Sequence, residues 1–349
     1  MNRTGILYAL VSAALFGATT PAAKFQLGEI DPVLLAGLLY CGAGFGIAIL
    51  RRIVPRRLVA ETAAPLTQRE APWLAGAVLF GGILGPSLMM WGVAHTEATT
   101  ASLLLTLEGV ATAAIAWFVF REGFDRRILF GMACLVAGAA VLAWSGTPTF
   151  DGVTGPLAIV GACLAWGIDN NLTRKVSLAD PFQIVELKGL VAGPFNVVLA
   201  LLAGASLPAP SFVALAAVTG FLGYGVSLAL YVVALRDLGA ARTSAYFATA
   251  PFLGAIVAVV GLGEPVTAGL LAAGILMALG VWLHATEHHE HEHVHQPMTH
   301  EHLHVHDAHH QHAHRSQDPP GEPHTHSHVH GQIKHSHPHT PDMHHTHRH

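Results

Sequence analysis

The chain has 349 residues, of which 52% are hydrophobic and 11% are charged. Soluble domains carry about 25% charged residues, so the composition excludes an ordinary soluble enzyme. A formal net charge of −4 provides no basic surface for nucleic acid. Residues 1–284 are strongly apolar, whereas residues 285–349 hold 24 of the 26 histidines. The sequence predicts an all-α polytopic membrane protein followed by a histidine-rich tail.

Ten apolar segments have about the length that a helix needs to cross a bilayer. They cover residues 5–23, 33–50, 72–93, 98–120, 127–144, 154–173, 182–203, 211–235, 240–262 and 266–284. Barrel strands alternate apolar and polar residues, and these segments do not. The first is longer than the core of a signal peptide, so we expect a retained helix.

Basic residues lie almost entirely on one side of these ten segments. With the N-terminus inside, 13 Lys and Arg residues fall on the inner side, and Lys24 alone falls on the outer side. Lys and Arg are enriched in cytoplasmic loops. We therefore expect a multi-pass protein of the cell (inner or plasma) membrane with both termini in the cytoplasm.

Short motifs recur in the two halves of the apolar region. The matching pairs are Leu15-Phe16-Gly17 with Ala165-Trp166-Gly167, Asp31-Pro32 with Asp180-Pro181, and Glu122 with Glu264. The offsets are 150, 149 and 142 residues. These matches predict two five-helix repeats, 1–145 and 153–284, followed by the tail, 285–349. Because five is odd, the repeats are inverted, as in alternating-access transporters that bind substrate near the midplane.

With these motifs and a glycine-rich last helix in each half (Gly131–Gly138 and Gly269–Gly280), the chain resembles the drug/metabolite transporter superfamily. The likeness is to its EamA-type permeases and covers roughly residues 5–284. It implies ten helices in two inverted repeats and secondary transport of a small metabolite or drug. It does not choose among amino acids, nucleotide sugars and quaternary amines. The long tail departs from the family pattern.

Ionisable residues inside spans are costly and mark candidate functional sites. Glu108 lies about halfway along the fourth segment. It is a candidate proton-binding or cation-binding carboxylate, or the partner of a substrate amine. The alternative is a carboxylate paired across helices to fix their packing.

The sixth segment ends in a polar run that begins Asp169-Asn170-Asn171. Three consecutive residues point in three directions around a helix, so at least two should face protein or water. We therefore expect Asp169 and Asn170 to line the pathway, with Thr173 on the same face as Asp169. The alternative is a polar helix end at the membrane surface.

The seventh segment contains Glu186, Lys188 and Asn196. Lys188 and Asn196 are eight residues apart and form a polar stripe. Lys188 could bind an anionic substrate group, compensate Glu108 or Asp169, or extend to the interface. Glu186 lies on another face and is kept as a binding candidate, as is Tyr246 near the start of the ninth segment.

Several other polar residues are expected to have structural roles. Glu122 and Glu264 end helices at corresponding places in the repeats, and His95 and Glu97 form a short outer turn. The cysteines at 41, 134 and 163 lie in apolar runs without metal-ligand spacing, so we expect core residues. No catalytic motif or phosphate-binding loop is present, so an ion or substrate gradient should drive transport.

The tail repeats His-x-His and His-His among few apolar residues, which predicts disorder. Its candidate metal ligands are His291, His293, His302, His304, His306, His324, His326, His328, His335, His337 and His339. Neutral imidazoles bind Zn, Ni, Co and Cu, so we expect a flexible chelator. The alternatives are a low-complexity extension without a role in transport and a pH-responsive charge cloud.

Two transport hypotheses and one binding hypothesis remain. The first is a metabolite or drug permease whose tail is an accessory. The second is a transporter of a divalent metal or its complex, with the tail as a collector; only the terminal His284 lies in a span, which counts against a bare ion. The third is a membrane-anchored metal store or sensor. The expected partners are a small solute and the lipid bilayer; no cofactor is required, and the oligomeric state is left open.

Overall fold

The computed structural model describes residues 3–53, 70–120, 126–144, 150–174, 176, 180–238, 243, 246–285, 290–295, 298–304, 324–330 and 333–338. Contacts divide the chain into a helical unit, made mainly of Met1–Glu287, and a tail unit, His288–Pro341. The two units are described separately.

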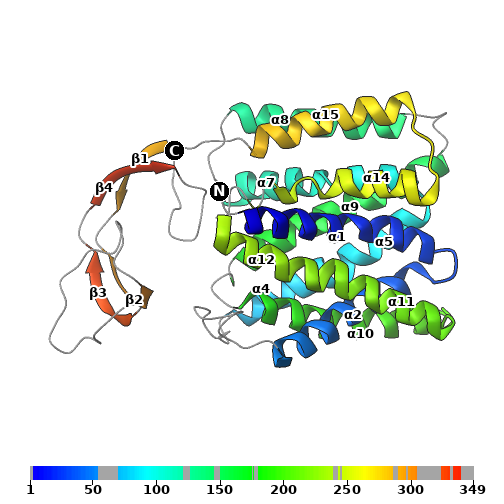
Figure 1. Ribbon diagram of the computed structural model, residues 1–349, viewed down its shortest axis with the longest axis horizontal. Helices are drawn as coiled ribbons and strands as arrows, with labels where there is room; N and C mark the ends of the chain where they lie inside the picture. Colours follow the sequence, from blue (N-terminus) through cyan, green and yellow to red (C-terminus); the bar gives the residue numbers. More distant parts are fainter. Residues whose placement is uncertain are drawn as a thin grey trace. The chain divides into compact units, whose positions relative to one another are not determined.

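The helical unit is a bundle of long apolar helices that lie side by side (Figure 1). Its first half contains α1 (Arg3–Gln26), α2 (Pro32–Ile53), α4 (Ala71–Ala77), the π-helix η1 (Val78–Leu84), α5 (Gly85–Ala94), α6 (Ala98–Leu104), α7 (Leu107–Phe120) and α8 (Arg126–Trp144). Its second half contains α9 (Phe150–Arg174), α10 (Pro181–Leu202), α11 (Pro210–Gly220), the π-helix η2 (Phe221–Val226), α12 (Ser227–Leu238), α14 (Ala250–Leu262) and α15 (Ala268–Ala285).

Several helical stretches are long and apolar enough to cross a membrane. Six are found among the described residues: Arg3–Gln26, Pro32–Ile53, Ala71–Ala94, Ala98–Val119, Phe182–Leu202 and Pro210–Ala234. Three shorter apolar helices accompany them: Arg127–Leu142, Ala250–Leu262 and Ala268–Leu283. Each predicted apolar segment contains at least one described helix. The chain is therefore a polytopic integral membrane protein.

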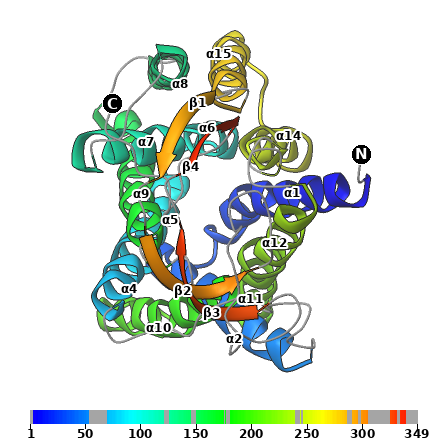
Figure 2. The same cartoon turned by 90° about the vertical axis from the view of Figure 1, so that its left-hand side faces the viewer.

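Small residues let the helices approach closely. Figure 2 shows the bundle along its helices, with α2 beside α10 and α1 beside α12 and α14, pairs that also contact each other. Where α2 meets α10, a Cβ atom added to Gly189 would lie 2.5 Å from the Cα of Gly44 and 2.7 Å from the Tyr40 carbonyl oxygen. In lipid, such close packing replaces the hydrophobic effect as the force between helices.

Three predicted continuous segments are interrupted. The fourth segment, 98–120, is broken at Leu105–Thr106 into α6 and α7, and the third and eighth contain η1 and η2. At the break, the Glu108 amide donates to the Leu105 carbonyl at 3.0 Å instead of to the Leu104 carbonyl. The Leu104 carbonyl thereby loses the partner that an unbroken helix would supply.

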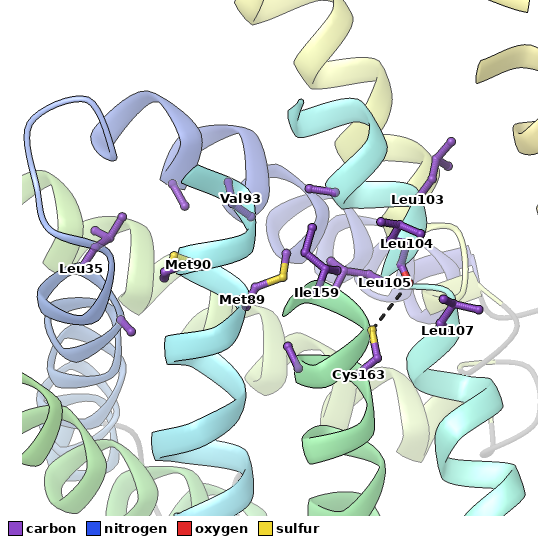
Figure 3. Close-up of a cluster of buried hydrophobic side chains, with 14 of the residues drawn as sticks. Leu35, Met89, Met90, Val93, Leu103, Leu104, Leu105, Leu107, Ile159 and Cys163 are labelled. Atoms are coloured by element: carbon purple, nitrogen blue, oxygen red, sulfur yellow. Dashed lines mark hydrogen bonds between the residues drawn. The ribbon is translucent and has the colours of Figure 1, made fainter. Parts of the chain in front are cut away.

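The buried core surrounds this break. Met89, Met90 and Val93 of α5, Leu103–Leu107, and Ile159 and Cys163 of α9 form one apolar cluster (Figure 3). The Cys163 thiol points to the Leu104 carbonyl, and its Sγ lies 3.6 Å from that oxygen. The cysteine is a buried core residue, as predicted, and it also satisfies the carbonyl that the helix break releases.

The tail unit contains four short strands where the sequence analysis expects disorder. β1 (Glu290–His295) pairs antiparallel with β4 (Ile333–Pro338), and β2 (Met298–His304) pairs antiparallel with β3 (His324–His330). The His-x-His pattern has the period of two of a strand and is compatible with this pairing. His306 and His339 lie outside the described residues.

The close approach of α2 and α10 leads to a stability prediction. Gly189→Ala should lower the free energy of unfolding by about 1–3 kcal/mol, because the added methyl group meets backbone atoms that cannot move aside. Gly274→Ala is the matched control: nothing lies within 4 Å of a Cβ atom at Gly274 of α15. Thermal unfolding in detergent measures both, and equal melting temperatures for the two variants would contradict the prediction.

Candidate functional site

Glu108 pairs with a residue of the other half of the chain. It lies in the first turn of α7, where the helix dipole favours a negative charge. The Asn170 amide of α9 donates to Glu108 Oε1 at 2.9 Å and to Thr112 Oγ1 at 3.1 Å. The two binding candidates therefore lie together, on helices from different halves.

Aromatic rings lie near this carboxylate. Glu108 interacts electrostatically with Tyr40 and Tyr224, which come from opposite halves. The ring centroids of Tyr40 and Tyr224 are 5.7 Å apart, and those of Phe16 and Tyr224 are 5.9 Å apart. Glu108 and the three rings are half-buried, and Asn170 is exposed. Carboxylates and aromatic rings both attract organic ammonium groups, so this set of residues is suited to such a group.

Asp169 and Lys188 form an ion pair between α9 and α10. Lys188 Nζ lies 2.6 Å from both carboxylate oxygens, and the Thr173 hydroxyl donates to Asp169 Oδ1 at 2.9 Å. The side chains are only 14% and 9% exposed. Among the alternatives for Lys188, the structure thus shows compensation of Asp169.

Three side chains converge on the carbonyls of η1. The Tyr40 hydroxyl and the Trp166 indole donate to the Gly81 carbonyl at 2.6 and 3.1 Å. The Asn196 amide donates to the Gly82 carbonyl at 3.0 Å. A π-helix shifts the backbone ladder, and such bulges are frequent at functional sites. Tyr40 and Trp166 were not predicted as site residues, although Trp166 lies in the repeated Ala-Trp-Gly motif.

Two predicted site residues lie apart from these contacts. Glu186 binds Arg51 of α2, which also binds Asp180 at 2.9 Å, at the start of α10. The ion pairs join α2 to α10, so the structure gives Glu186 a packing partner. Tyr246 is half-buried, and its carbonyl accepts the Thr249 hydroxyl at 2.6 Å in the turn before α14.

Two charged side chains hold the turn between α5 and α6. The Lys24 ammonium donates to the carbonyls of Val93, Ala94 and Thr96 at 2.7–3.2 Å. The Glu264 carboxylate accepts the amides of Ala98 and Thr99, each at 2.7 Å. Glu264 thus has the structural role that the sequence analysis expects. Its counterpart, Glu122, lies outside the described residues.

A preformed metal cluster is not found in the part of the chain that the structure describes. No group of three or more His, Cys, Asp or Glu residues there could hold a metal ion. The chemistry assembled around Glu108 and η1 is therefore the Glu108 carboxylate, the Asp169–Lys188 ion pair, amides and aromatic rings.

The profile of the EamA-like transporter family matches residues 3–144 and again residues 153–286. The chain belongs to the EamA-like transporter family. EamA proteins are transporters, so the chain is a membrane permease and not an enzyme. The two matches cover the two halves between which the Glu108–Asn170 contact is made.

Similar proteins include other transporters. A probable amino-acid metabolite efflux pump of Salmonella typhimurium is 26% identical over 303 residues, with 81% of this chain and 95% of that protein covered. A probable terminal-alkyne amino-acid exporter of Streptantibioticus cattleyicolor is 26% identical, with 72% and 87% covered. An uncharacterized transporter of Methanothermobacter thermautotrophicus is 25% identical, with 80% and 85% covered.

A solved structure has the same EamA-type fold. It has a TM-score of 0.57 at 19% sequence identity, with 81% of this chain and 97% of that chain covered. At this identity the likeness concerns the fold alone.

The Asp169–Lys188 pair can be tested by a double-mutant cycle. Lys188→Met should destabilise the protein by about 3–5 kcal/mol, because it leaves a buried carboxylate without its counter-ion. Adding Asp169→Asn should recover much of that loss, since the double variant buries no charge. Thermal unfolding of the two single variants and the double variant measures the coupling; additive effects would contradict a direct pair.

Proposed function

We propose that this EamA protein is a secondary transporter that exports small amine-bearing metabolites by alternating access. Ten helices in two inverted repeats, residues 1–145 and 153–284, would form the pathway. The observation that carries the proposal is the Glu108–Asn170 contact, a carboxylate in a broken membrane helix bonded to the other repeat beside aromatic rings.

Repeat architecture is supported by features at corresponding positions. The family profile matches each half once. The π-helices η1 and η2 lie in the third apolar segment of each half, and turns interrupt the fourth segment of each half, at residues 105–106 and 248–249. Inverted repeats with interrupted helices near the midplane are the architecture of transporters that expose one site to either side in turn.

An ammonium-bearing solute fits the residues around Glu108. The carboxylate attracts the cation, the Asn170 amide carbonyl can accept a hydrogen bond from it, and the rings of Tyr40 and Tyr224 offer electron-rich faces. The names of the Salmonella and Streptantibioticus relatives refer to amino-acid compounds and to outward transport. Both lines of reasoning favour export of an amino acid or a related amine.

Export of substrate can be coupled to entry of protons because both compete for the Glu108 carboxylate. A proton and a substrate ammonium each neutralise Glu108, so the protein can carry one or the other through the bilayer, where a bare charge is costly. Exchange of protons for substrate would then drive export. The cytoplasmic termini expected from the distribution of Lys and Arg would place the tail on the side from which substrate is taken.

Glu108→Gln tests the coupling. It keeps the size and hydrogen bonding of the side chain but removes its negative charge and its titration. We expect a loss of proton-driven transport of at least ten-fold, because the variant can neither release a proton nor attract the substrate ammonium. The measurement is proton-driven flux of radiolabelled amino acids and amines in proteoliposomes.

Glu29→Gln is the matched control, because Glu29 is exposed in the turn after α1. Its flux should equal that of the unchanged protein. Undiminished proton-driven accumulation in Glu108→Gln would refute the role of Glu108. An inactive Glu29→Gln variant would instead indicate that carboxylates outside the pathway also control flux.

For the tail we propose a metal-binding accessory role. Its imidazoles suit Zn, Ni, Co and Cu, and the irregular spacing allows several ligand sets. The second hypothesis, transport of a metal complex, predicts that metal flux depends on the helices. The two hypotheses therefore differ in what a tail-less chain does.

A chain truncated after Ala285 should lose most binding of Ni²⁺, Co²⁺ and Zn²⁺ but keep its amine flux. Equilibrium binding to the purified proteins and radioactive-metal uptake in vesicles measure the two properties. Full metal binding by the truncated chain would contradict the accessory role of the tail. Metal flux that persists without the tail would instead support the second hypothesis.

A further inference from the structure

The two π-helices have corresponding surroundings. Gly81 of η1 and Gly223 of η2 are 142 residues apart, the offset of the Glu122 and Glu264 motif. A methyl group at Gly81 would collide with Asp169, and one at Gly223 would collide with Thr19. Asp169 and Thr19 are themselves 150 residues apart, the offset of the Phe16 and Trp166 motif. Each π-helix therefore packs against the same place on the first helix of the other half.

Side chains hold η1 from three directions. Tyr40 and Trp166 share the Gly81 carbonyl, and Asn196 binds the Gly82 carbonyl. These donors come from α2, α9 and α10, so helices of both halves are fastened to η1. Asp169, locked by Lys188, closes the remaining side against Gly81.

The corresponding positions around η2 offer no such donors. At the motif offsets, Phe16 corresponds to Trp166, Gly189 to Tyr40 and Ile47 to Asn196. None of these three side chains has a hydrogen-bond donor. Ser12 bonds to Ser227, but Ser227 lies just after η2.

The charges beside the two π-helices differ as well. The positions that correspond to Asp169 and Lys188 are Thr19 and Leu39. Thr19 interacts with the side chain of Tyr224, which belongs to η2 itself, and its hydroxyl also bonds to the Phe16 carbonyl. Beside η2, a neutral hydroxyl contact of Thr19 therefore takes the place of the Asp169–Lys188 ion pair that lies beside η1.

We propose that Tyr40, Trp166 and Asn196 are positioning residues that keep η1 stationary during the transport cycle, so that η2 is the π-helix that rearranges. Moving η1 would leave the Gly81 and Gly82 carbonyls without partners in a medium that has no water to replace them. Among the residues that the structure describes, no side chain is found to donate to a carbonyl of η2, so moving η2 breaks no corresponding bond there. The inference rests on the alternating-access proposal, and it gives the two repeats different parts in that cycle.

Amide hydrogen exchange of the full-length protein in nanodiscs tests the asymmetry directly. Peptides that cover η2 should exchange at least ten-fold faster than peptides that cover η1. Tyr40→Phe removes one donor and should raise exchange in η1 about two- to ten-fold, the effect of one lost hydrogen bond. Tyr8→Phe removes a hydroxyl from α1 away from η1 and should leave exchange in η1 unchanged.

The distribution of the change separates positioning from general stability. If Tyr40 holds η1, Tyr40→Phe raises exchange in η1 while peptides of α8 and α15 keep their rates. A rise throughout the bundle would overturn the positioning role, as would equal exchange in η1 and η2 of the unchanged protein. The exchange measurement needs no substrate. A result that refutes the role of Glu108 in coupling would therefore leave this test unaffected.

Discussion

A polar group in hydrocarbon must find its partner inside the protein, and this constraint fixes the position of α9. Its consecutive residues Asp169, Asn170 and Asn171 point in three directions, so no single neighbouring helix can satisfy them. Asp169 takes Lys188 of α10, Asn170 takes Glu108 of α7, and Asn171 donates to the carbonyls of Thr112 and Gly167. The polar run therefore ties α9 to both helices, and the aromatic rings and η1 are arranged around that junction.

Glycines, which have no side chain, matter as much as polar residues in this arrangement. Asp169 can lie against η1 only because Gly81 has no Cβ atom, and α2 can approach α10 only because Gly44 and Gly189 have none. Close approach brings the Tyr40 hydroxyl of α2 within 2.6 Å of the Gly81 carbonyl. By allowing close approach, the glycines increase the van der Waals contact between helices and leave the space in which the buried hydrogen bonds form.

Sequence periodicity and charge were sufficient for the apolar helices and for the cost of burying Glu108. They offered Asp169 as one of several partners for Lys188, and the contact itself selects it. They were insufficient for the break at Leu105–Thr106, because both residues are compatible with a helix. The break is stabilised from a distance by Cys163, 59 residues from Leu104. The hydrogen bonds to the Gly81 carbonyl of η1 likewise depend on Tyr40 and Trp166, which are distant in the sequence and meet only in the folded chain. Arg51 is one of the basic residues that indicate membrane orientation, and nothing in the sequence pairs it with Glu186. The pairing of the tail strands depends on register, which a period of two does not give.

The helices and their interruptions recur in both halves of the chain, whereas the charged side chains do not. At corresponding offsets, Glu108 has Ala250 as its counterpart, Asp169 has Thr19 and Lys188 has Leu39, so each charge occurs in one half only. A symmetric set of charges would place a second carboxylate near the first, and the two would repel in a medium of low dielectric constant. A single carboxylate at the position of Glu108 avoids that cost, and in the proposed mechanism it would accept one cation at a time. Under the proposed alternating access, an inverted backbone would let the site face either side, and the unequal side chains would decide what neutralises it. One-for-one exchange would then follow from the side chains and not from the fold.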